Sequence, residues 1–359
     1  MDPISQGAAG AALSGTAATR RQLLAAGAVG ALAGMAPDLD VLIRSPTDPL
    51  LFLEYHRQFT HSLIFIPLGA LLCALPLHLL VRRWLRFHQT YLFAALGYAT
   101  HGLLDACTSY GTQLLWPFSD ARIAWNAIAV VDPLFTLPLL GLLAAALVRR
   151  QPWLARAGLL WGLSYLALGA FQGVRAEHAA QALAHSRGHD PQRLTAKPSF
   201  GNLLVWKSIY ADGDWFYVDA LRVGLRVSYF PGERARRLDR GRDLPWLDKN
   251  SQQARDVERF RRFSGDFLAV EATDPTRIVD VRYSMVPNEI EPLWGIRLER
   301  GAPLDQHVEF FMSRRATAEH RQALGRMLRT SGGEPITSAD LRPVNLPVRG
   351  PVPPYRAAP

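Results

Sequence analysis

Hydrophobic residues form long runs in the first half of the chain, whereas in the second half they alternate with polar residues over short stretches. The long runs cover roughly residues 4–18, 22–36, 62–81, 91–108, 133–148 and 153–172. The third run has no charged residue and about the 20 residues that a helix needs to cross a bilayer. The last two are similar or slightly short. The first two are short and rich in Gly and Ala, which predicts a closely packed helical hairpin or a re-entrant pair.

The period of the pattern changes in the second half. An amphipathic stretch through residue 185 predicts a further helix. Aromatic and β-branched runs at 203–210 and 215–220, separated by Asp212-Gly213-Asp214, then predict a β-hairpin. More strands are expected at 267–271, 278–285 and 294–298, followed by a helix at 316–328. Repeated Pro residues from 331 on indicate a disordered tail.

These elements define the expected architecture. Residues 1–172 should form an α-helical membrane bundle of about four full spans plus a short N-terminal helical hairpin. Residues 173–330 should form a small soluble α+β domain, and residues 331–359 a Pro-rich tail. The distribution of charge supports the division, because residues 1–172 hold only 11 of the 40 Lys and Arg and 8 of the 31 Asp and Glu. A chain of 359 residues is long enough for two such units.

Arginine residues predict how the bundle is oriented. Eight of them lie in the turns between successive apolar runs: Arg20, Arg21, Arg82, Arg83, Arg86, Arg149, Arg150 and Arg156. The other face carries only Arg44, Arg57 and Arg122 in its loops. Because positively charged loops stay in the cytoplasm, we expect a multi-pass protein of the bacterial inner membrane. The other face and the C-terminal domain should then be extracytoplasmic.

The net charge of +9 does not by itself indicate a nucleic-acid partner, and no motif for one is present. Basic clusters at 234–237 and 259–262 are simplest to interpret as solvated faces, with anionic lipid headgroups as a second interpretation. Cys73 and Cys107 lie in apolar runs, where free cysteine acts as a small hydrophobe, so no disulfide framework is predicted. Membrane lipids are the expected partners, and the sequence names no protein partner for the C-terminal domain.

Six ionisable residues lie in or beside the apolar runs, at three places along the chain. They are Asp38 and Asp40, His56 and His61, and His101 and Asp105. An ionisable group at membrane depth costs several kcal/mol unless it is paired or bound to a metal. Each place has a simpler explanation of its own. Asp38 and Asp40 could form a polar helix end, His56 and His61 could be interfacial histidines, and His101 and Asp105 could be a buried hydrogen-bonded pair. All three together favour a metal site.

Spacing indicates how each pair could serve such a site. Asp38 and Asp40 follow Pro37 on an irregular backbone, and two carboxylates can approach one cation there. His56 and His61 are five apart, which on a helix turning about 100° per residue would put them on different faces. A loop that leads into a helix capped near Thr60 would bring them together, and Arg57 could then hold an anionic oxygen such as that of a phosphate.

His101 and Asp105 are four apart and share one face of a helix. Both could bind one metal, or Asp105 could orient His101. Asp132 precedes Pro133 and is either a ligand or, as we favour, a helix N-cap. A mixed N/O ligand set suits Zn²⁺, with Mn²⁺ or Fe as alternatives, and more than four ligands would indicate two ions. Such a site activates water and polarises a phosphoryl or acyl group.

The order and spacing of these motifs resemble a family of inner-membrane-associated, metal-dependent hydrolases typified by YdjM-like bacterial proteins. The resemblance covers about residues 1–150. It rests on Met1–Gly7, Pro37-Asp38-Leu39-Asp40, His56-Arg57-Gln58-Phe59-Thr60-His61-Ser62, His101-Gly102-Leu103-Leu104-Asp105, Trp116-Pro117-Phe118 and Asp132-Pro133. It implies a hydrolase, distantly similar to zinc-dependent phospholipase C and P1-type nucleases. Gln6 departs from the pattern, since many relatives carry His there.

The leading hypothesis is therefore a membrane-bound hydrolase of a small-molecule or lipid phosphoester. Its metal ligands or their partners are Asp38, Asp40, His56, His61, His101 and Asp105, and Arg57 and Asp105 take part in catalysis. Two alternatives remain open. A non-catalytic membrane anchor could use a structural metal and present the C-terminal domain to a partner, and an ion-coupled transporter could use the same residues as a proton relay.

Overall fold

The computed structural model describes residues 1–271, 273–313 and 316–329. The chain forms two compact units. The membrane unit comprises Met1–Ile43, Glu54–Gly173 and Phe200–Leu203. The sheet unit comprises Arg44–Leu53, Val174–Ser199 and the described residues from Leu204 on. The expected Pro-rich tail at 331–359 lies outside the described residues.

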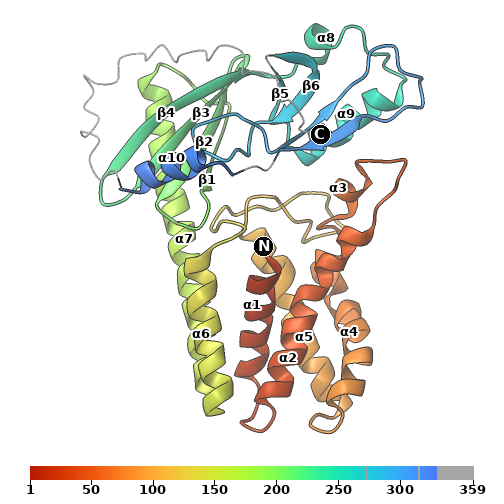
Figure 1. Ribbon diagram of the computed structural model, residues 1–359, viewed down its shortest axis with the longest axis vertical. Coiled ribbons are helices and arrows are strands. Elements are labelled where there is room, and N and C mark those ends of the chain that lie inside the picture. The colour runs from red at the N-terminus through yellow and green to blue at the C-terminus, as the bar shows by residue number, and fades with distance from the viewer. Residues whose placement is uncertain (272, 314–315, 330–359) are drawn as a thin grey trace. The chain divides into compact units, whose positions relative to one another are not determined.

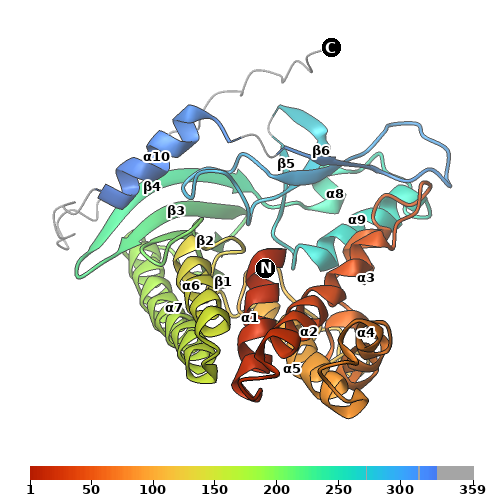
Figure 2. The same ribbon diagram turned by 60° about the horizontal axis from the view of Figure 1, so that its bottom comes forward.

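Helices make up the membrane unit (Figure 1). They are α1 (Pro3–Thr16), α2 (Leu23–Met35), α4 (Ile66–Val81), α5 (Phe87–Ala106), α6 (Pro133–Arg149) and the first part of α7 (Pro152–Ser186). Short 3-10 segments η1 (Ala36–Leu42), η2 (Phe59–His61) and η3 (Leu63–Phe65) join α2 to α4, together with α3 (Leu51–Tyr55). α1, α2, α4 and α5 lie side by side, with α2 in contact with all three others (Figure 2).

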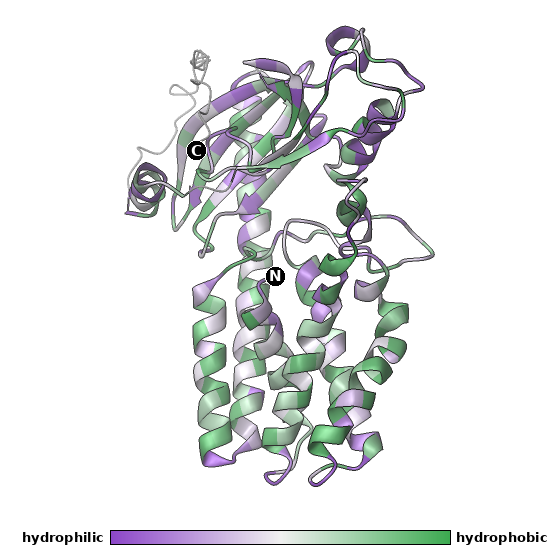
Figure 3. Cartoon of the chain, turned by 45° about the vertical axis from the view of Figure 1, so that its right-hand side comes forward, coloured by the Kyte–Doolittle hydropathy of each residue, from purple (hydrophilic) through white to green (hydrophobic). Residues whose placement is uncertain are grey.

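Within the part of the chain that the structure describes, three stretches are long and apolar enough to cross a membrane: Leu23–Leu42, Leu63–Val81 and Pro152–Ser186. Only 22% of the residues in the most apolar window of Leu63–Val81 are buried, so most of this stretch is left uncovered by the rest of the unit. The helices of the membrane unit are coloured mostly as hydrophobic (Figure 3). α6 is apolar but shorter. The expectation of four full spans is not confirmed. α5 has 20 residues, but some of them are polar and buried inside the unit, namely Thr90, His101 and Asp105.

Glycine lets three of these helices approach closely. A Cβ atom on Gly97 of α5 would lie 2.3 Å from the carbonyl oxygen of Gly30 on α2, and one on Gly10 of α1 would meet the same oxygen at 2.3 Å. No larger residue fits at such a contact, which is how small residues permit tight packing of membrane helices. The contact fixes α5 against α2 one turn before His101.

The sheet unit contains two antiparallel sheets. The first, in the order β1-β2-β3-β4, is formed by β1 (Arg193–Pro198), β2 (Val205–Asp212), β3 (Trp215–Val223) and β4 (Val227–Arg236). The second, in the order β5-β6-β7-β8, is formed by β5 (Leu268–Glu271), β6 (Asp274–Asp280), β7 (Trp294–Arg297) and β8 (Glu309–Met312). The helices are the rest of α7, α8 (Arg240–Asp243), α9 (Gln252–Phe263) and α10 (Ala318–Arg329).

The first sheet is covered on both faces. One face packs Trp206 and Leu221 against Ala176, Ala180 and Leu183 of α7. The other face packs against the second sheet through a core of side chains from both: Ile209, Ala211, Phe216, Val218, Phe267, Ala269, Val279 and Val281. Burial on both faces explains why β2 lacks the clean alternation of a half-exposed strand.

The expected hairpin is β2–β3, and the strands expected near 267, 278 and 294 are β5, β6 and β7. β6 ends at Asp280, so the strand predicted through residue 285 is wrong in its second half. Three strands were not expected at all, namely β1, β4 and β8. α7 runs without a break from Pro152 to Ser186, where the sequence suggested an apolar run followed by a separate amphipathic helix.

Candidate metal centre

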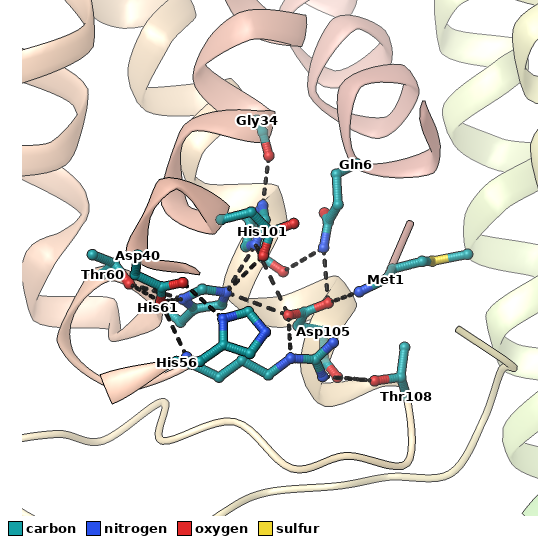
Figure 4. A network of polar contacts seen from close by, with 12 residues as sticks. Met1, Gln6, Gly34, Asp40, His56, Thr60, His61, His101, Asp105 and Thr108 are labelled. Atoms are coloured by element: carbon teal, nitrogen blue, oxygen red, sulfur yellow. Dashed lines mark hydrogen bonds and ion pairs between the residues drawn. The ribbon is translucent and has the colours of Figure 1, made fainter. Parts of the chain in front are cut away.

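The three predicted pairs come together at one end of the membrane unit. Asp38 and Asp40 lie on η1 directly after α2, His61 lies on η2 before α4, and His101 and Asp105 lie in the last two turns of α5 (Figure 4). The eight arginines lie in, or within two helical turns of, the loops that join the opposite ends of the helices. The polar residues are therefore gathered at one end, as expected from the alternation of loops along the chain.

Gly102 brings His61 against α5. A Cβ atom at this position would lie 2.2 Å from the carbonyl oxygen of His61, so only glycine lets the η2 backbone contact the helix. Neighbouring turns of α5 then present His101 and Asp105 to the His61 ring. The i, i+4 spacing of these two residues puts both on the side that faces η1 and η2.

Four donor atoms from these elements converge on one point, and we call these residues the four-donor cluster. They are Asp38 Oδ1, His61 Nε2, His101 Nε2 and Asp105 Oδ2. The two Nε2 atoms are 2.9 Å apart. His61 Nε2 is 3.4 Å from Asp105 Oδ2 and 3.6 Å from Asp38 Oδ1. His101 Nε2 is 3.4 Å from Asp38 Oδ1 and 3.9 Å from Asp105 Oδ2.

These separations fit a tetrahedral metal site. Zn–N and Zn–O distances of about 2.0–2.2 Å place neighbouring donors of a regular tetrahedron about 3.3–3.6 Å apart. The five separations given above range from 2.9 to 3.9 Å and centre on that value. Two imidazoles and two carboxylates also suit zinc chemically. The residues therefore fit a single divalent ion.

Hydrogen bonds to the other ring nitrogens direct both Nε2 atoms at the cluster centre. His101 Nδ1 donates to Gly34 O at 2.6 Å. His61 Nδ1 lies 2.9 Å from Thr60 Oγ1 and 3.2 Å from Asp40 Oδ2. Since Nδ1 holds the proton in both rings, both Nε2 atoms turn lone pairs toward each other and toward two carboxylates. A positive charge between them is required.

In the metal-free cluster that charge is a proton. Burial lowers the pKa of His61, but hydrogen bonds with Asp105, Asp38 and Asp40 outweigh burial and raise the pKa to about 10. One N–H can point at only one acceptor, however, so a proton on His61 cannot serve Asp38 and Asp105 together. Asp105 Oδ2 is fully buried, lies 3.0 Å from Arg57 Nε and has no well-aligned hydrogen bond in the described structure. A metal ion would engage all four donors at once.

Asp105 is fixed by its other oxygen. Oδ1 accepts a hydrogen bond from Gln6 Nε2 at 2.9 Å and contacts the amino nitrogen of Met1. Gln6 thus orients a candidate ligand from the side away from the cluster, and its own Oε1 is buried without a hydrogen bond. The departure from the family pattern at this position therefore leaves the four donors intact.

Asp40 is a partner of the cluster's histidine. Its Oδ1 accepts from His56 Nδ1 at 2.7 Å. Its Oδ2 accepts from Thr60 Oγ1 at 2.7 Å and from the Arg57 amide at 3.1 Å, in addition to His61. The sequence predicted a helix cap near Thr60, and this prediction is wrong. Thr60 instead donates to Asp40, and no side chain caps η2, η3 or α4. A carboxylate with both oxygens so engaged orients its partners.

Asp38, Asp40 and His56 form a second group whose ligand atoms lie within 4.8 Å of one another. It shares Asp38 with the four-donor cluster. Access to both is from this side, because the Asp38 and His56 side chains are 22% and 29% exposed, whereas those of His61, His101 and Asp105 are fully buried.

Arg57 points inward. Its Nε lies 3.0 Å from Asp105 Oδ2, its Nη1 donates to Thr108 Oγ1 at 3.1 Å, and its guanidinium lies over the Tyr110 ring. The residue has φ of 65°, in the left-handed region, which turns its amide toward Asp40. A non-glycine residue pays roughly 1 kcal/mol or more for this conformation. The strain is found where one residue must contact both acidic sides of the site.

Two other candidate residues lie apart from the cluster. Asp132 is the N-cap of α6, accepting from the amides of Leu134 and Phe135, as favoured from the sequence, and it also accepts from Tyr165. Cys107 packs in an apolar core. Sequence reasoning missed the supporting residues Gly34 and Thr108. It also missed a separate group in the sheet unit, formed by Glu289, Glu291 and His320, whose spacing carries no recognisable motif.

Comparison with known proteins places the cluster in a family. Residues 1–176 match the family described as YdjM inner membrane protein. The N-terminal half of this chain belongs to the YdjM family. This YdjM segment contains every residue of the four-donor cluster and ends within α7, and residues 177–359 lie outside it. Family membership and the three apolar stretches together place the protein in a membrane.

Two relatives share part of the YdjM segment. The inner membrane protein YbcI of Escherichia coli (strain K12) is 36% identical over 107 residues, which are 28% of this chain and 60% of YbcI. The uncharacterized protein YfhP of Bacillus subtilis (strain 168) is 29% identical over 106 residues, which are 29% of this chain and 32% of YfhP. The chain thus matches less than two thirds of either relative. No solved structure matches it significantly.

Proposed function

We propose that this protein is a membrane-bound, metal-dependent hydrolase of phosphoesters, with a lipid or lipid-like molecule as its substrate. One observation carries the proposal: four donors of the kind and separation that a divalent ion requires converge at one end of the membrane unit, with one side of the cluster open. Zinc is the ion that the two-nitrogen, two-oxygen set fits best, with Mn²⁺ or Fe as alternatives. When bound, such an ion polarises a phosphoryl oxygen and lowers the pKa of water.

The surrounding residues support this chemistry in distinct ways. Asp38, His61, His101 and Asp105 are the ligands. Asp40 and Gly34 hold the histidines in the tautomer that a metal needs, and Arg57 and Gln6 hold Asp105. Arg57 also provides a fixed positive charge beside the cluster, which favours an anionic substrate.

His56 is the group best placed for proton transfer. Asp40 accepts from its Nδ1 and so turns Nε2 away from Asp40, on the open side of the cluster. Its ring centroid lies 5.8 Å from that of His61. A half-exposed imidazole held by a buried carboxylate is suited to donate a proton to a leaving group. We therefore assign it this role and assign the ion to the four-donor cluster alone.

Exposed apolar residues beside the open side favour a lipid-like substrate. Leu39 and Leu42 flank the two aspartates on η1 and are 65% and 75% exposed. A water-soluble substrate would gain nothing from these side chains, whereas an acyl chain would cover them.

The test combines metal content with turnover. Purified protein in detergent is expected to contain one equivalent of zinc by elemental analysis and to hydrolyse a short-chain phospholipid or a chromogenic phosphodiester. His101→Ala should lose both while remaining folded. His185→Ala, which removes an exposed histidine of α7, is the matched control and should lose neither. Bound metal without hydrolysis of any phosphoester tested would contradict the hydrolase, and absence of metal after reloading would remove the mechanism altogether.

A structural metal is the second candidate, because the four donors come from three separate segments of the chain. An ion there would also tie η1, η2 and α5 together. Chelation separates the two functions. If the ion is structural, its removal should lower the melting temperature of the membrane unit sharply. If the ion is catalytic, its removal should leave an inactive but folded bundle in which a proton replaces the metal.

A further inference from the structure

Exposed apolar side chains of the first sheet gather at one of its ends. Leu225, at the turn between β3 and β4, is fully exposed, and Leu204, just before β2, is 38% exposed. The two turns are adjacent, because the Val223 amide donates to Leu204 O at 2.7 Å. Isolated exposed leucines are ordinary, but a fully exposed one in a turn adjacent to a second exposed leucine needs an explanation.

This end of the sheet is attached to α7 where the apolar part of the helix ends. Arg175 Nη2 donates to Gly224 O, next to Leu225, at 2.6 Å. Gln172 Nε2 donates to Leu203 O at 3.1 Å. The apolar run of α7 covers about 153–172, and about 20 residues of helix span the hydrocarbon core of a bilayer. Residues 172–175 therefore lie at the boundary of the membrane, and the turns attached to them lie there too.

The opposite end of the sheet lies farther from this part of α7. β2 runs from Val205 to Asp212, so its ends are separated by roughly 23 Å at about 3.3 Å per residue. The far end carries charges of both signs, since Asp212 and Asp214 lie there together with Arg193 and Arg236. The near end carries Arg226 beside the fully exposed Leu225. An exposed basic residue and an exposed leucine therefore lie side by side at the end next to the apolar part of α7.

We propose that this end of the first sheet, defined by Leu204, Leu225 and Arg226, inserts into the headgroup region of an anionic phospholipid bilayer. Leu204 and Leu225 enter the boundary between headgroups and acyl chains, and the exposed Arg226 contacts lipid phosphates. The partner is the bilayer in which α7 itself is embedded. The contact fixes the sheet unit at the membrane surface and does not depend on the proposed hydrolase activity.

Site-specific fluorescence tests the proposal in the full-length protein. Cys73 and Cys107 are replaced by Ala, and a single cysteine is introduced by Leu225→Cys or, as control, by Asp190→Cys at the far end of the sheet. Each is labelled with an environment-sensitive dye and reconstituted into vesicles of phosphatidylglycerol and phosphatidylcholine. The dye at 225 should emit at shorter wavelength than the dye at 190 and should be quenched by lipids that carry a spin label at the top of the acyl chain.

Two further variants keep the test decisive. Leu204→Cys provides a second position at the same end and should behave like 225 if Leu225→Cys fails to fold. Arg226→Glu, combined with the label at 225, should reduce the quenching in phosphatidylglycerol vesicles. Equal exposure to water at 225, 204 and 190 would overturn the proposal. Lipid quenching at 225 that is insensitive both to Arg226→Glu and to lipid charge would overturn the assignment of an anionic partner.

Discussion

Asp40 orients the histidines around the four-donor cluster in the structure, although it was a candidate ligand in the sequence. Both of its oxygens are used, one by His56 and the other by Thr60, Arg57 and His61. It could bind an ion only by giving up hydrogen bonds that orient two histidines. The carboxylate–histidine–metal arrangement is the common solution to this problem, and it raises the basicity of the ligating imidazole.

Replacing Asp40 should therefore weaken metal binding without abolishing it. Asp40→Ala is expected to lower zinc affinity about 10- to 100-fold, the usual cost of losing such a partner. His101→Ala removes a donor and should lower it far more. Competition with a calibrated chelator measures both. Equal losses in the two folded variants would show that Asp40 is itself a ligand.

Lys207 is a buried charge of a different kind, on the face of β2 that looks toward residues 281–290. Burial is the main influence and lowers its pKa to about 7, although Glu233, Asp280 and Glu289 oppose the change. Its Nζ donates to Ser284 Oγ at 2.6 Å and to Glu289 O at 2.7 Å. The protonated form thus has partners, but not enough to recover what it loses by leaving water.

This lysine should make the sheet unit more stable as the pH rises. The unfolded chain holds the proton up to a pKa of 10.5, whereas the folded protein releases it near 7. Between these values the unfolded state binds more protons, so the free energy of unfolding increases with pH. Below pH 7 both states are protonated and the full penalty applies.

Lys207→Met removes the titration. Its stabilising effect relative to the natural protein should be a few kcal/mol at pH 7, at about 1.4 kcal/mol per pKa unit, and should shrink by pH 9.5. Thermal unfolding of both proteins at the two pH values measures the change. A difference in melting temperature that stays constant with pH would contradict the assigned pKa.

At the scale of elements, contact between backbones positions the candidate ligands. His101 and Asp105 face the cluster because α5 meets α2 at Gly97 and meets η2 at Gly102. The donor separations of 2.9 to 3.9 Å leave little tolerance for displacement of η2. A side chain inserted between η2 and α5 must therefore change the distances between His61 and the donor atoms of His101 and Asp105.

Gly102→Ala should abolish tight metal binding, because its Cβ would lie 2.2 Å from His61 O. Gly141→Ala on α6 is the matched control, since no atom lies within 4 Å of the added Cβ. Both changes raise helix propensity equally. Zinc titration of the two variants compares them. If Gly102→Ala binds zinc as tightly as Gly141→Ala, the close contact between η2 and α5 does not position His61.

The sequence indicated these elements to different degrees, for physical reasons. Apolar runs predicted the helices of the membrane unit because burial and lipid exposure both require apolar residues there. The i, i+4 spacing of His101 and Asp105 placed both on one face of α5. η1 and η2 could not be predicted in detail, because their form follows from tertiary contacts such as Thr60 with Asp40. The strand β4 was missed because its charged half, Glu233–Arg236, masks alternation.

At the scale of the whole molecule, the sequence separated an apolar half from a charged half, and it predicted five of the eight strands that the structure describes in the second half but not the two sheets that they form. The first sheet is covered on both faces, which hides the alternation that an exposed sheet would display. The expected number of full membrane spans is not confirmed, because an apolar run with buried polar residues, such as α5, resembles a span in the sequence. The convergence of four donors could be expected in outline only. Which of six residues would face an ion depends on backbone contacts that no spacing reveals.

Orientation is the last property that charge predicts for the molecule as a whole. The eight arginines lie at the end of the membrane unit opposite the cluster, and arginine-rich loops stay in the cytoplasm. The cluster should then face the extracytoplasmic side and take its metal from there. Single cysteines test this in a background with Cys73 and Cys107 replaced by Ala. Thr19→Cys lies in the exposed turn between α1 and α2, and Asp120→Cys lies on the exposed loop after α5.

A membrane-impermeant maleimide added to intact cells should label Asp120→Cys and spare Thr19→Cys, while both should react after the membrane is permeabilised. Neither substitution removes an arginine, so the charges that set the orientation are unchanged. The reverse labelling would place the cluster in the cytoplasm. In that case the arginines at the far end would have to be held there by the fold of the bundle, against the positive-inside preference.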